Sequence, residues 1–512
     1  MNTSDTLNKV ERDRYDKIAR LEELGINPYP SEPFKVDTTP EKIVATYEKE
    51  APDNWQVSIA GRIMSRRVMG KTCFMSLQYE GKKIQLFVQR QTLCPSDDKI
   101  LYDEVVKKLL DIGDLIGVQG VVFRTKAGEI SIKVTHLTLL AKSIKPLPDI
   151  KEVNQAGEGI KRFNDFTDPE ARYRQRYVDL IVNPHVREVF IKRAQIVKTI
   201  REYFDSKGYL EVETPILQPL YGGAAAKPFT THHNRLNQKL FLRISNELYL
   251  KRLIVGDYKG VYEFSKDFRN EGMSRFHNPE FTQVEVYVAY QDYQWMMGEV
   301  EKIIHNVAQA LHGTAKVAVG EHTIDFSTPW KRFTMYEIIK EYTGLDVSTM
   351  EEETLRKEIT KRGITIDKGA GKGKLLDELF GATCEPHIIQ PTFITDYPIE
   401  TSPLAKKHRD DPNLVERFEV ICNGKEILNA FSELNDPVDQ RRRFEAQAQL
   451  AKRGDEEAMV LDEDFIRALS YGMPPTVGLG IGIDRLTMIM TNQSSIRDVL
   501  FFPQMRPEGG SV

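Results

Sequence analysis

The residues with the clearest chemical character lie in one segment, from Asp267 to Tyr287 (DFRNEGMSRFHNPEFTQVEVY). The segment contains arginines, acids, a histidine and an aromatic ring, among them Arg269 and Phe281. An arginine presents a planar set of donors that fits phosphate or carboxylate oxygens, and Phe281 could stack against a flat heterocycle. This combination indicates a nucleotide site. The alternative is a solvated hairpin with a charged loop.

The elements that must position these side chains are two runs typical of strands, 260–264 (GVYEF) and 281–288 (FTQVEVYV). The loop between them contains Gly272 and Pro279, so the pattern predicts two antiparallel strands joined by a long charged loop. Because strands hold side chains rigidly, an arginine at a strand end can be aimed at a ligand.

A second segment, Gly478–Leu486 (GLGIGIDRL), precedes apolar sequence compatible with a helix. Glycines at alternate positions let another backbone or a ligand approach closely. We expect Asp484 to cap the following helix and Arg485 to lie in its first turn, facing whatever the glycines admit. The glycine spacing differs from that of a Rossmann fingerprint, and the chain has no P-loop pattern.

A pair of acids is predicted from the segment Arg417–Asn429 (RFEVICNGKEILN). The Asn-Gly pair at 423–424 is a strong signal for a two-residue hairpin turn. The resulting register pairs Ile421 with Glu426 and puts Glu419 on the same face as Glu426. Two such carboxylates can bridge magnesium ions held by phosphate oxygens. Exposed strand acids are the alternative.

The N-terminal part of the chain has the two-residue period of strands. Five runs of this kind, with a helix over 103–110 after the third, are typical of an OB-fold barrel, which commonly binds single-stranded nucleic acid. The five runs are 56–69, 72–80, 83–90, 114–125 and 129–140. Residues 55–145 carry 15 Lys and Arg against 8 Asp and Glu, although the whole chain has a net charge of −4. A basic module on an acidic body suits a protein that binds a polyanion locally. A purely structural barrel is the alternative.

Composition excludes several classes of protein. The length of 512 residues predicts two or three domains, and 40% hydrophobic with 29% charged residues is ordinary for a globular protein. No apolar run is long enough to span a membrane, and the N-terminus lacks the apolar core of a secretory signal. The four cysteines form neither a zinc pattern nor a disulfide framework, so we expect a reducing, cytoplasmic location and cysteines that act as small core residues.

Three segments together resemble the signature motifs of the class II aminoacyl-tRNA synthetases. The run FRNEG…RFHNPEF resembles motif 2, GLGIGIDRL resembles motif 3, and Ile196–Leu217, with FDSKGYLEVETPIL, resembles motif 1. They occur in the family's order, and the resemblance extends over roughly residues 55–505. Within subclass IIb it is closest to the lysine-specific members.

The resemblance implies an α+β fold. An N-terminal five-stranded OB-fold β-barrel would be followed by a class II catalytic domain built on an antiparallel sheet flanked by helices. The expected boundaries are 1–55 for an N-terminal helical segment, 56–145 for the anticodon-binding barrel, 146–185 for a linker and 186–512 for the catalytic domain, with a helical insertion at about 330–415.

The implied activity joins L-lysine to the α-phosphorus of ATP, releases pyrophosphate and then transfers lysine to the 3′-terminal ribose of tRNA(Lys). The implied partners are ATP, L-lysine, tRNA(Lys), Mg²⁺ and a second copy of the chain in a homodimer. Because the substrate carboxylate is already a nucleophile, activation needs no general base. It needs groups that hold two anions together and stabilise the charge that grows on the α-phosphate.

By the same resemblance, each group of residues has a role. The ATP-binding residues would be Arg269, Glu271, His277, Asn278, Phe281, Glu419 and Arg485, of which Arg269 and Arg485 would be catalytic. The lysine-binding residues would be Gly223, Glu247, Arg269, Glu285, Tyr287, Asn429, Phe431 and Glu433. The metal ligands would be Glu419 and Glu426. The residues that read the central U of the anticodon would be Phe74, Gln85 and Glu129. Burial in the barrel core is the alternative for Phe74.

One geometric requirement follows from these assignments. Strict alternation places Asn429, Phe431 and Glu433 on the opposite face from Glu419 and Glu426. If all five serve one site, a bulge or bend must fall near Leu428.

Three other functions remain open from the sequence. An aspartyl- or asparaginyl-type synthetase would share the barrel and the motifs, but an aspartate-specific enzyme would need a cation facing the substrate side chain, and no cation is evident there. The chain could also be a synthetase-like RNA-binding protein without catalysis, or a paralogue that attaches lysine to a protein.

Overall fold

The computed structural model describes residues 8–148, 150–155, 159–164, 166–366, 369–452 and 459–508. The chain divides into two compact units, Met1–Glu188 and Val189–Val512. Each unit is described by itself.

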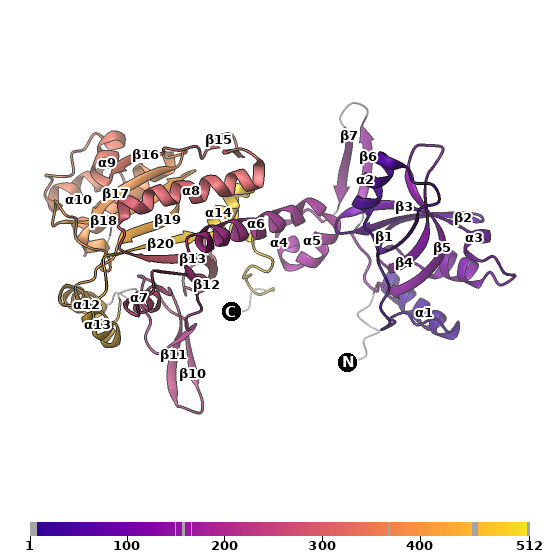
Figure 1. Ribbon diagram of the computed structural model, residues 1–512, viewed down its shortest axis with the longest axis horizontal. Helices are drawn as coiled ribbons and strands as arrows, with labels where there is room; N and C mark the ends of the chain where they lie inside the picture. Colours follow the sequence, from indigo (N-terminus) through magenta and orange to yellow (C-terminus); the bar gives the residue numbers. More distant parts are fainter. Residues whose placement is uncertain are drawn as a thin grey trace. The chain divides into compact units, whose positions relative to one another are not determined.

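In the N-terminal unit, five strands close into a barrel in the order β1-β2-β3-β5-β4 (Figure 1). The strands are β1 (Gln56–Met69), β2 (Thr72–Tyr79), β3 (Lys82–Gln89), β4 (Leu115–Arg124) and β5 (Ile130–Ala141). Alternate side chains such as Ile59, Met75, Leu86 and Val118 fill the barrel and are almost fully buried. The predicted OB-fold barrel is confirmed, and every strand end lies within one residue of its expected position.

The N-terminal unit also contains several helices and a two-stranded hairpin. They are α1 (Lys9–Glu23), α2 (Pro40–Glu50), α3 (Arg90–Leu93), the π-helix η2 (Leu101–Leu109), the hairpin β6 (Ile150–Gln155) and β7 (Gly159–Asn164), α4 (Pro169–Arg174) and α5 (Arg176–Val182). Asn8 caps α1 in a capping box with Glu11, which satisfies two of the free backbone donors at the helix start.

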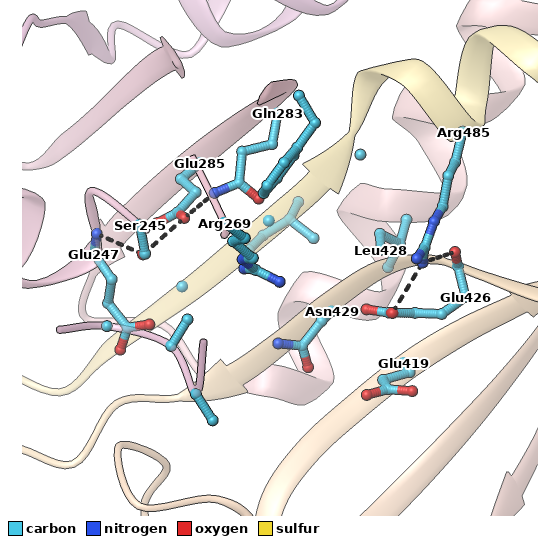
Figure 2. Close-up of a pocket in the computed structure, with 18 of the residues that line it drawn as sticks. Ser245, Glu247, Arg269, Gln283, Glu285, Glu419, Glu426, Leu428, Asn429 and Arg485 are labelled. Atoms are coloured by element: carbon cyan, nitrogen blue, oxygen red, sulfur yellow. Dashed lines mark hydrogen bonds and ion pairs between the residues drawn. The ribbon is translucent and has the colours of Figure 1, made fainter. Parts of the chain in front are cut away.

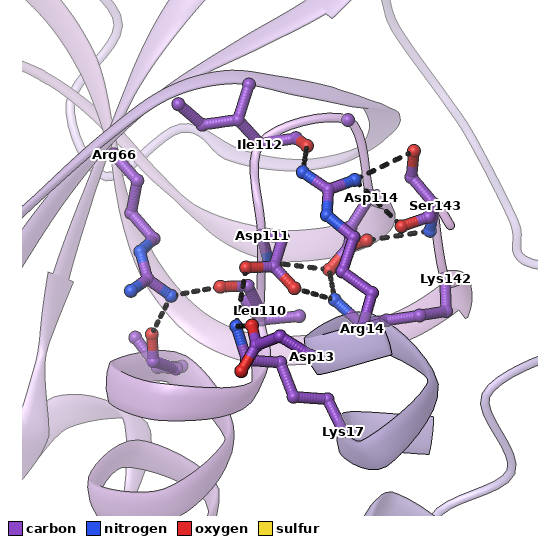
Figure 3. A network of polar contacts seen from close by, with 12 residues as sticks. Asp13, Arg14, Lys17, Arg66, Leu110, Asp111, Ile112, Asp114, Lys142 and Ser143 are labelled. Carbon is purple, nitrogen blue, oxygen red and sulfur yellow. Dashed lines mark hydrogen bonds and ion pairs between the residues drawn. The ribbon is translucent and has the colours of Figure 1, made fainter. Parts of the chain in front are cut away.

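A buried ion network fastens α1 to the barrel (Figure 3). Lys142, whose side chain is fully buried, forms ion pairs with Asp111 and Asp114. From α1, Lys17 Nζ lies 2.9 Å from Asp111 Oδ1, and Arg14 donates to backbone carbonyls on either side of the network. The network therefore joins α1 to the loop before β4 and to the residues after β5, which are about a hundred residues away in the sequence.

The second unit is built on an eight-stranded sheet in the order β16-β17-β18-β19-β20-β13-β12-β8. The strands are β8 (Leu210–Glu211), β12 (Gly260–Phe268), β13 (Glu280–Ala289), β16 (Lys331–Thr334), β17 (Thr392–Pro398), β18 (Leu414–Cys422), β19 (Lys425–Ser432) and β20 (Thr476–Gly482). The central pairs are antiparallel, as expected. The pairs β16–β17 and β12–β8, one at each edge, are parallel, so the sheet is mixed rather than purely antiparallel.

The second unit also contains nine helices, counting α6, within the described residues. They are α6 (Pro184–Ser206), which crosses the boundary between the units, α7 (Glu247–Val255), α8 (Tyr293–His312), α9 (Met335–Thr343), α10 (Glu352–Lys361), α11 (Lys372–Thr383), α12 (Pro437–Lys452), α13 (Glu463–Ser470) and α14 (Ile483–Met490). Smaller elements are β9 (Leu217–Gln218), β10 (Thr230–His233), β11 (Gln238–Leu242), β14 (Lys316–Val319), β15 (His322–Asp325) and the 3₁₀ turns η3 (Glu385–His387), η4 (Ile399–Thr401) and η5 (Ile496–Asp498). The segment at about 330–415, expected to be a helical insertion, contains α9, α10 and α11 but also supplies β16 and β17 to the sheet.

The alternation of side chains along β13 gives the two faces of the sheet different characters. Val284, Val286 and Val288 pack in one core with residues of α6, α8 and α14, and Figure 1 shows α8 running along the sheet in much the same direction as β19 and β20. Glu285 and Tyr287 point to the other face because successive strand residues alternate. The chemically active side chains of β13 therefore share the face opposite α8.

Two further expectations concern the whole chain. Among the described residues, no helix is both long and apolar enough to cross a membrane. All four cysteines are free and buried, which confirms that they act as core residues.

Candidate active site

A cavity of about 440 Å³ lies on the face of the sheet that carries Glu285 and Tyr287. This volume falls within the range of small-molecule sites, which is roughly 300–1,000 Å³. The cavity is lined by all the residues predicted for ATP, lysine and metal in this unit except Glu433. These are Gly223, Glu247, Arg269, Glu271, His277, Asn278, Phe281, Glu285, Tyr287, Glu419, Glu426, Asn429, Phe431 and Arg485.

The floor of the cavity is formed by the alternate glycines of β20. Gly478 pairs with Tyr287 on one side and Phe431 on the other, and Gly480 pairs in the same way with Glu285 and Asn429. Because a glycine has no side chain, the four flanking side chains converge over a flat strip of backbone. The glycine run thus leaves room for a ligand, as its spacing predicts.

The hairpin of β18 and β19 has the predicted turn and the predicted irregularity. Ile421 pairs with Glu426 across the turn, whose Asn423 and Gly424 both have positive φ, as a type I′ turn requires. The register then shifts by one residue, so that Glu419 lies opposite Asn429. This bulge, at the position where the site assignments require one, brings Asn429 onto the face of Glu419.

Arg269 has a polar side chain that the protein itself does not satisfy. Its guanidinium lies 5.0 Å from the centre of the Phe281 ring, and its buried Nε has no hydrogen-bond partner in the part of the chain that the structure describes. Since an unpartnered guanidinium in a cavity is matched by an anion, the geometry suits a carboxylate or phosphate group here.

Arg485 lies in the first turn of α14, as expected, and connects two parts of the site (Figure 2). Its Nη1 donates to the backbone oxygen of Glu426 at 2.8 Å and lies 3.1 Å from Glu426 Oε2. Its Nη2 donates to His277 Nε2 at 3.2 Å. A guanidinium only donates, so Nε2 must accept and Nδ1 donates to Ser274 Oγ at 2.8 Å. Burial, followed by the nearby Arg485, lowers the pKa of His277 and favours this neutral form.

The expectation that Asp484 caps α14 is wrong. The N-cap residue is Gly482, and Asp484 is the second residue of the helix, inside its first turn. Its buried carboxylate accepts from the Thr282 backbone N–H at 2.8 Å and pairs with Arg193 of α6 at 2.6 Å. Asp484 therefore joins α6, β13 and α14 instead of ending a helix.

The two predicted metal ligands lie at one end of the cavity. Arg417 donates to Glu419 Oε1 at 2.6 Å and to Asn429 Oδ1 at 2.9 Å. Burial, together with the neighbouring Glu426, raises the pKa of Glu419 to about 8. Two converging carboxylates that repel each other are suited to a hard divalent cation. The described residues contain no cluster of three or more metal-binding side chains, so a cation here would need further oxygens from a ligand.

The other end of the cavity is rich in buried acids. Glu285 accepts hydrogen bonds from Gln283 Nε2 at 2.6 Å, from Tyr287 at 2.9 Å and from Ser245 Oγ at 3.2 Å. Burial, then the nearby Asp267, raises its pKa to about 8. Gly223 has φ +88°, and an added Cβ would lie 2.8 Å from Ser245 Oγ, so the backbone there can only be glycine without strain.

Glu433 does not line the cavity but lies directly behind its wall. It is 1% exposed, and a Cβ placed on Gly478 would collide with its Oε1. Its Oε2 forms an ion pair with Lys251, which also pairs with Glu247. Its Oε1 has no hydrogen-bond partner among the described residues, so one acceptor remains available beside Tyr287.

Several residues at the site were missed by sequence reasoning, although a signal existed for each. Gln283, Ser245 and Arg417 stand two positions before Glu285, Glu247 and Glu419, respectively, and all three line the cavity. A period of two would have placed Gln283 and Arg417 beside these acids. Lys251 follows Glu247 by four residues on α7, which is the spacing of a helical ion pair.

In the barrel, Phe74 is half-buried and lies on the outer surface, because its neighbour Met75 points into the core with 1% exposure. Its ring is 5.1 Å from that of Phe87, which is 5.8 Å from Phe123. The three rings form a row across the strands, and such a row can stack with bases. Of the other predicted anticodon residues, Gln85 accepts from Ser131 Oγ at 3.0 Å, and Glu129 is exposed.

Comparison with known proteins agrees with this arrangement. Residues 168–506 match the family of tRNA synthetases class II (D, K and N), and residues 57–140 match the OB-fold nucleic acid binding domain. The chain is 55% identical over 503 residues to the lysine–tRNA ligase of Porphyromonas gingivalis strain ATCC 33277. The aligned residues cover 98% of this chain and 86% of the relative. It is 53% identical over 506 residues to the lysine–tRNA ligase of Christiangramia forsetii, and the alignment covers 99% of this chain and 88% of the relative. It is 52% identical over 495 residues to the lysine–tRNA ligase of Azobacteroides pseudotrichonymphae, and that alignment covers 97% of this chain and 98% of the relative. The chain therefore belongs to the class II tRNA synthetases of the D, K and N group.

Proposed function

We propose that this chain is an ATP-dependent lysine–tRNA ligase. The observation that carries the proposal is the position of Arg269, whose guanidinium lies in the cavity between two groups of acids (Figure 2). Glu419 and Glu426 lie on one side, and Glu247 and Glu285 lie on the other. The first group suits a cation bound to phosphate, and the second suits an ammonium group.

In the first step, a carboxylate oxygen of lysine forms a bond to the α-phosphorus of ATP, and the bond to pyrophosphate breaks. Arg269 binds both the carboxylate and the α-phosphate, which holds the reacting atoms together and stabilises the charge on the phosphoryl oxygens. Phe281 stacks on adenine, while Glu271, His277 and Asn278 contact the nucleotide. Arg485 binds the γ-phosphate and is held in place by Glu426 and His277.

Glu419 and Glu426 fit Mg²⁺ because they are two converging carboxylates with a strong mutual repulsion. When bound, Mg²⁺ would neutralise charge on the phosphate oxygens. Arg417 orients Glu419 for this role through their 2.6 Å contact.

Lysine is selected over shorter or neutral amino acids by the acids at the inner end of the cavity. Glu247, with Gly223 beside it, binds the α-amino group. Glu433 and Tyr287 bind the ε-ammonium group, and Asn429 and Phe431 line the path of the side chain. A neutral competitor would leave buried acids without a cation, which is costly.

In the second step, the 3′-hydroxyl of the terminal ribose of tRNA(Lys) attacks the carbonyl carbon of the activated lysine, and AMP leaves. We assign the proton of this hydroxyl to a phosphate oxygen of the adenylate. This assignment predicts that alanine at each nearby acid leaves single-turnover transfer close to normal, and one acid that selectively abolishes transfer would contradict it.

The barrel reads the anticodon of tRNA(Lys) in this proposal. Phe74 stacks on the central base, and Gln85 and Glu129 contact its edge. The boundaries 1–55, 56–145, 146–185 and 186–512 are proposed as the functional divisions of the chain. The enzyme works in the cytoplasm as a homodimer formed through α6 and the strand that follows it.

The test is ATP–pyrophosphate exchange with lysine, aspartate and asparagine in parallel. The proposal predicts exchange with lysine alone. Exchange driven by aspartate or asparagine would assign the chain to a different member of the same group, and no exchange with any of the three would favour an RNA-binding protein without catalysis.

A further inference from the structure

Lys251 is a fully buried lysine behind the wall of the cavity. It lies on α7 with 0% exposure, and its Nζ forms ion pairs with Glu247 and Glu433. The rings of Phe431 and Phe465 lie 5.5 Å and 5.9 Å from the same nitrogen. The ammonium group is thus enclosed by aromatic surfaces, and its charge is shared between two acids from different elements.

The two acids use their oxygens in the same way. Glu247 contacts Lys251 through Oε1, while its Oε2 has no partner among the described residues and Glu247 lines the cavity. Glu433 contacts Lys251 through Oε2, and its Oε1 lacks a hydrogen bond in the described part of the chain. Each carboxylate therefore keeps one oxygen free, and the proposed function assigns these two oxygens to the α-amino and the ε-ammonium group of lysine.

We propose that Lys251 is a positioning residue that holds one oxygen of Glu247 and one oxygen of Glu433, so that each carboxylate presents its other oxygen to one ammonium group of the substrate. The proposal rests on the proposed function and deepens it, because it explains how two acids in a dry pocket are shared between two amino groups. In this role Lys251 does not contact the substrate; it acts only through the two carboxylates.

The charges around Lys251 support this role. The titratable and charged groups that face the cluster are Glu247 from α7, Glu285 and Tyr287 from β13, Arg417 from β18, and Glu433 after β19. Arg252, the next residue of α7, pairs instead with Asp462 and Asp464. Burial raises the pKa of Glu247 and raises that of Glu433 well above its ordinary value, and Lys251 is the strongest opposing influence on both. Although burial alone would lower the pKa of Lys251, the two acids raise it, so the lysine stays charged.

The test compares Lys251→Met with Lys251→Arg and Lys142→Met in lysine-dependent ATP–pyrophosphate exchange between pH 6.5 and 8.5. Lys142 is a matched control, because it is also buried between two acids but lies in the barrel. We expect Lys251→Met to raise KM for lysine by ~10- to 100-fold, the size of a lost charge-assisted hydrogen bond. KM for ATP should change less than about twofold on the same reasoning.

A pH profile separates positioning from general structural support. Without Lys251, protons are held more tightly by Glu247 and Glu433, so the KM defect for lysine should shrink as the pH rises. Lys251→Arg keeps the charge and should recover part of the lysine affinity, and Lys142→Met should leave KM for lysine unchanged. A Lys251→Met enzyme with the wild-type KM for lysine at every pH would overturn the proposal, as would equal losses for lysine and ATP with no dependence on pH.

If Lys251→Met does not fold, the double variant Lys251→Met/Glu433→Gln removes one acid together with the lysine and is compared with Glu433→Gln alone. Because Lys251 acts through both acids, part of its effect is already absent in Glu433→Gln, so the further loss of lysine affinity in the double variant should be smaller than the ~10- to 100-fold expected for Lys251→Met alone. Fully additive losses would overturn the proposal. The wild-type enzyme separates failure of the proposed function from failure of this inference. If the wild-type enzyme shows no lysine-dependent exchange, both the proposed function and the inference are wrong. If the wild-type enzyme is active and Lys251→Met is unaffected, only the inference is wrong.

Discussion

Each unit of the molecule contains one fully buried lysine between two acids, and the two clusters are satisfied to different degrees. In the barrel unit, Asp114 accepts from Lys142 and from two backbone N–H groups, and Asp111 accepts from Lys142 and Lys17. In the catalytic unit, Glu433 keeps one oxygen without a partner among the described residues. We call the first the closed cluster (Lys142, Asp111, Asp114) and the second the open cluster (Lys251, Glu247, Glu433).

The pKa values follow this difference. Burial tends to raise the pKa of Asp111, but the hydrogen bonds from Lys142 and Lys17 bring it below its ordinary value. Burial prevails in the open cluster, where the pKa of Glu433 is raised well above the ordinary value despite Lys251. A buried polar cluster that satisfies all its groups stabilises a fold, whereas one that leaves acceptors unused has capacity for a ligand. The predictions below test this distinction.

The largest effect is expected in the closed cluster. Replacing Lys142 with Met leaves Asp111 and Asp114 as buried charges without their main cation, which costs about 3–5 kcal/mol in the free energy of unfolding. Urea denaturation followed by circular dichroism measures this loss. Lysine-dependent exchange of the folded protein should be unchanged, and a specific rise in KM for lysine would contradict the assignment of a purely structural role.

The opposite pattern is expected for Arg269, whose guanidinium has an unsatisfied donor. Arg269→Ala should slow lysine activation by about 3–4 kcal/mol, the effect of losing a preorganised donor to a developing charge. The free energy of unfolding should change little, because Arg269 has no ion-pair partner among the described residues and its Nε has no acceptor. Single-turnover adenylate formation and denaturation of the same sample test both parts. A large loss of stability in Arg269→Ala would contradict this prediction, because it would mean that Arg269 supports the fold, as Lys142 does.

Gly478 tests the space that the open cluster needs. In Gly478→Ala the new methyl group would meet Glu433 and lie 2.6 Å from Tyr287 Cε1, which we expect to cost about 2 kcal/mol in lysine binding through forced shifts of both side chains. Equilibrium binding of lysine measures the effect. Gly298→Ala in α8 is the matched control, since its Cβ would meet nothing within 4 Å. Unchanged lysine affinity in Gly478→Ala would mean that Glu433 does not face the ligand.

Binding of the nucleotide with Mg²⁺ should depend on pH through Glu419. The pKa of Glu419 is raised to about 8, so the carboxyl is mostly protonated at pH 7 and mostly ionised at pH 9. Only the ionised form binds a cation, so affinity should rise by roughly tenfold over this interval, about 1.4 kcal/mol. Titrations of Mg²⁺–ATP at several pH values test this. Glu419→Gln should bind more weakly and lose the pH dependence, and a wild-type affinity that falls with rising pH would contradict the assignment.

The smallest effect is expected at the edge of the closed cluster. Lys17 is partly exposed and pairs with Asp13 and Asp111, while Lys142 still compensates the charge of Asp111. Lys17→Ala should therefore cost less than about 1 kcal/mol in the free energy of unfolding. A loss as large as that of Lys142→Met would show that the outer cation, not the buried one, holds the network together.

Local patterns predicted the elements well. The five barrel strands and the Asn-Gly turn of β18 and β19 follow from period, turn chemistry and strand register, all of which act over a few residues. The bulge beside Leu428 was also predictable, because Asn429 and Glu419 could not otherwise share a site. The assigned roles of the cavity residues stay predictions.

The errors and omissions share a physical cause. Asp484 has the composition of a helix cap, but its partners Thr282 and Arg193 come from distant segments. Lys251 looks like an ordinary solvent-facing helix residue until Glu433, which is 182 positions away, is brought beside it. Such contacts depend on tertiary packing, which no local pattern encodes.

The bulge in β19 also bears on how this gene can change. The extra residue at Ile427 lies between two stretches of regular pairing, so a codon deletion there would remove an irregularity and leave a smoother ladder. This deletion would leave the pairs Ile421–Glu426 and Glu419–Asn429 as they are, so Asn429 and Phe431 would keep the face of the sheet that carries the cavity. The bulge therefore lets β19 lose one residue at this point without reversing the faces that carry the site. We expect a one-residue deletion to be tolerated better at Ile427 than at Ala430, where it would turn either Asn429 or Phe431 away from the cavity.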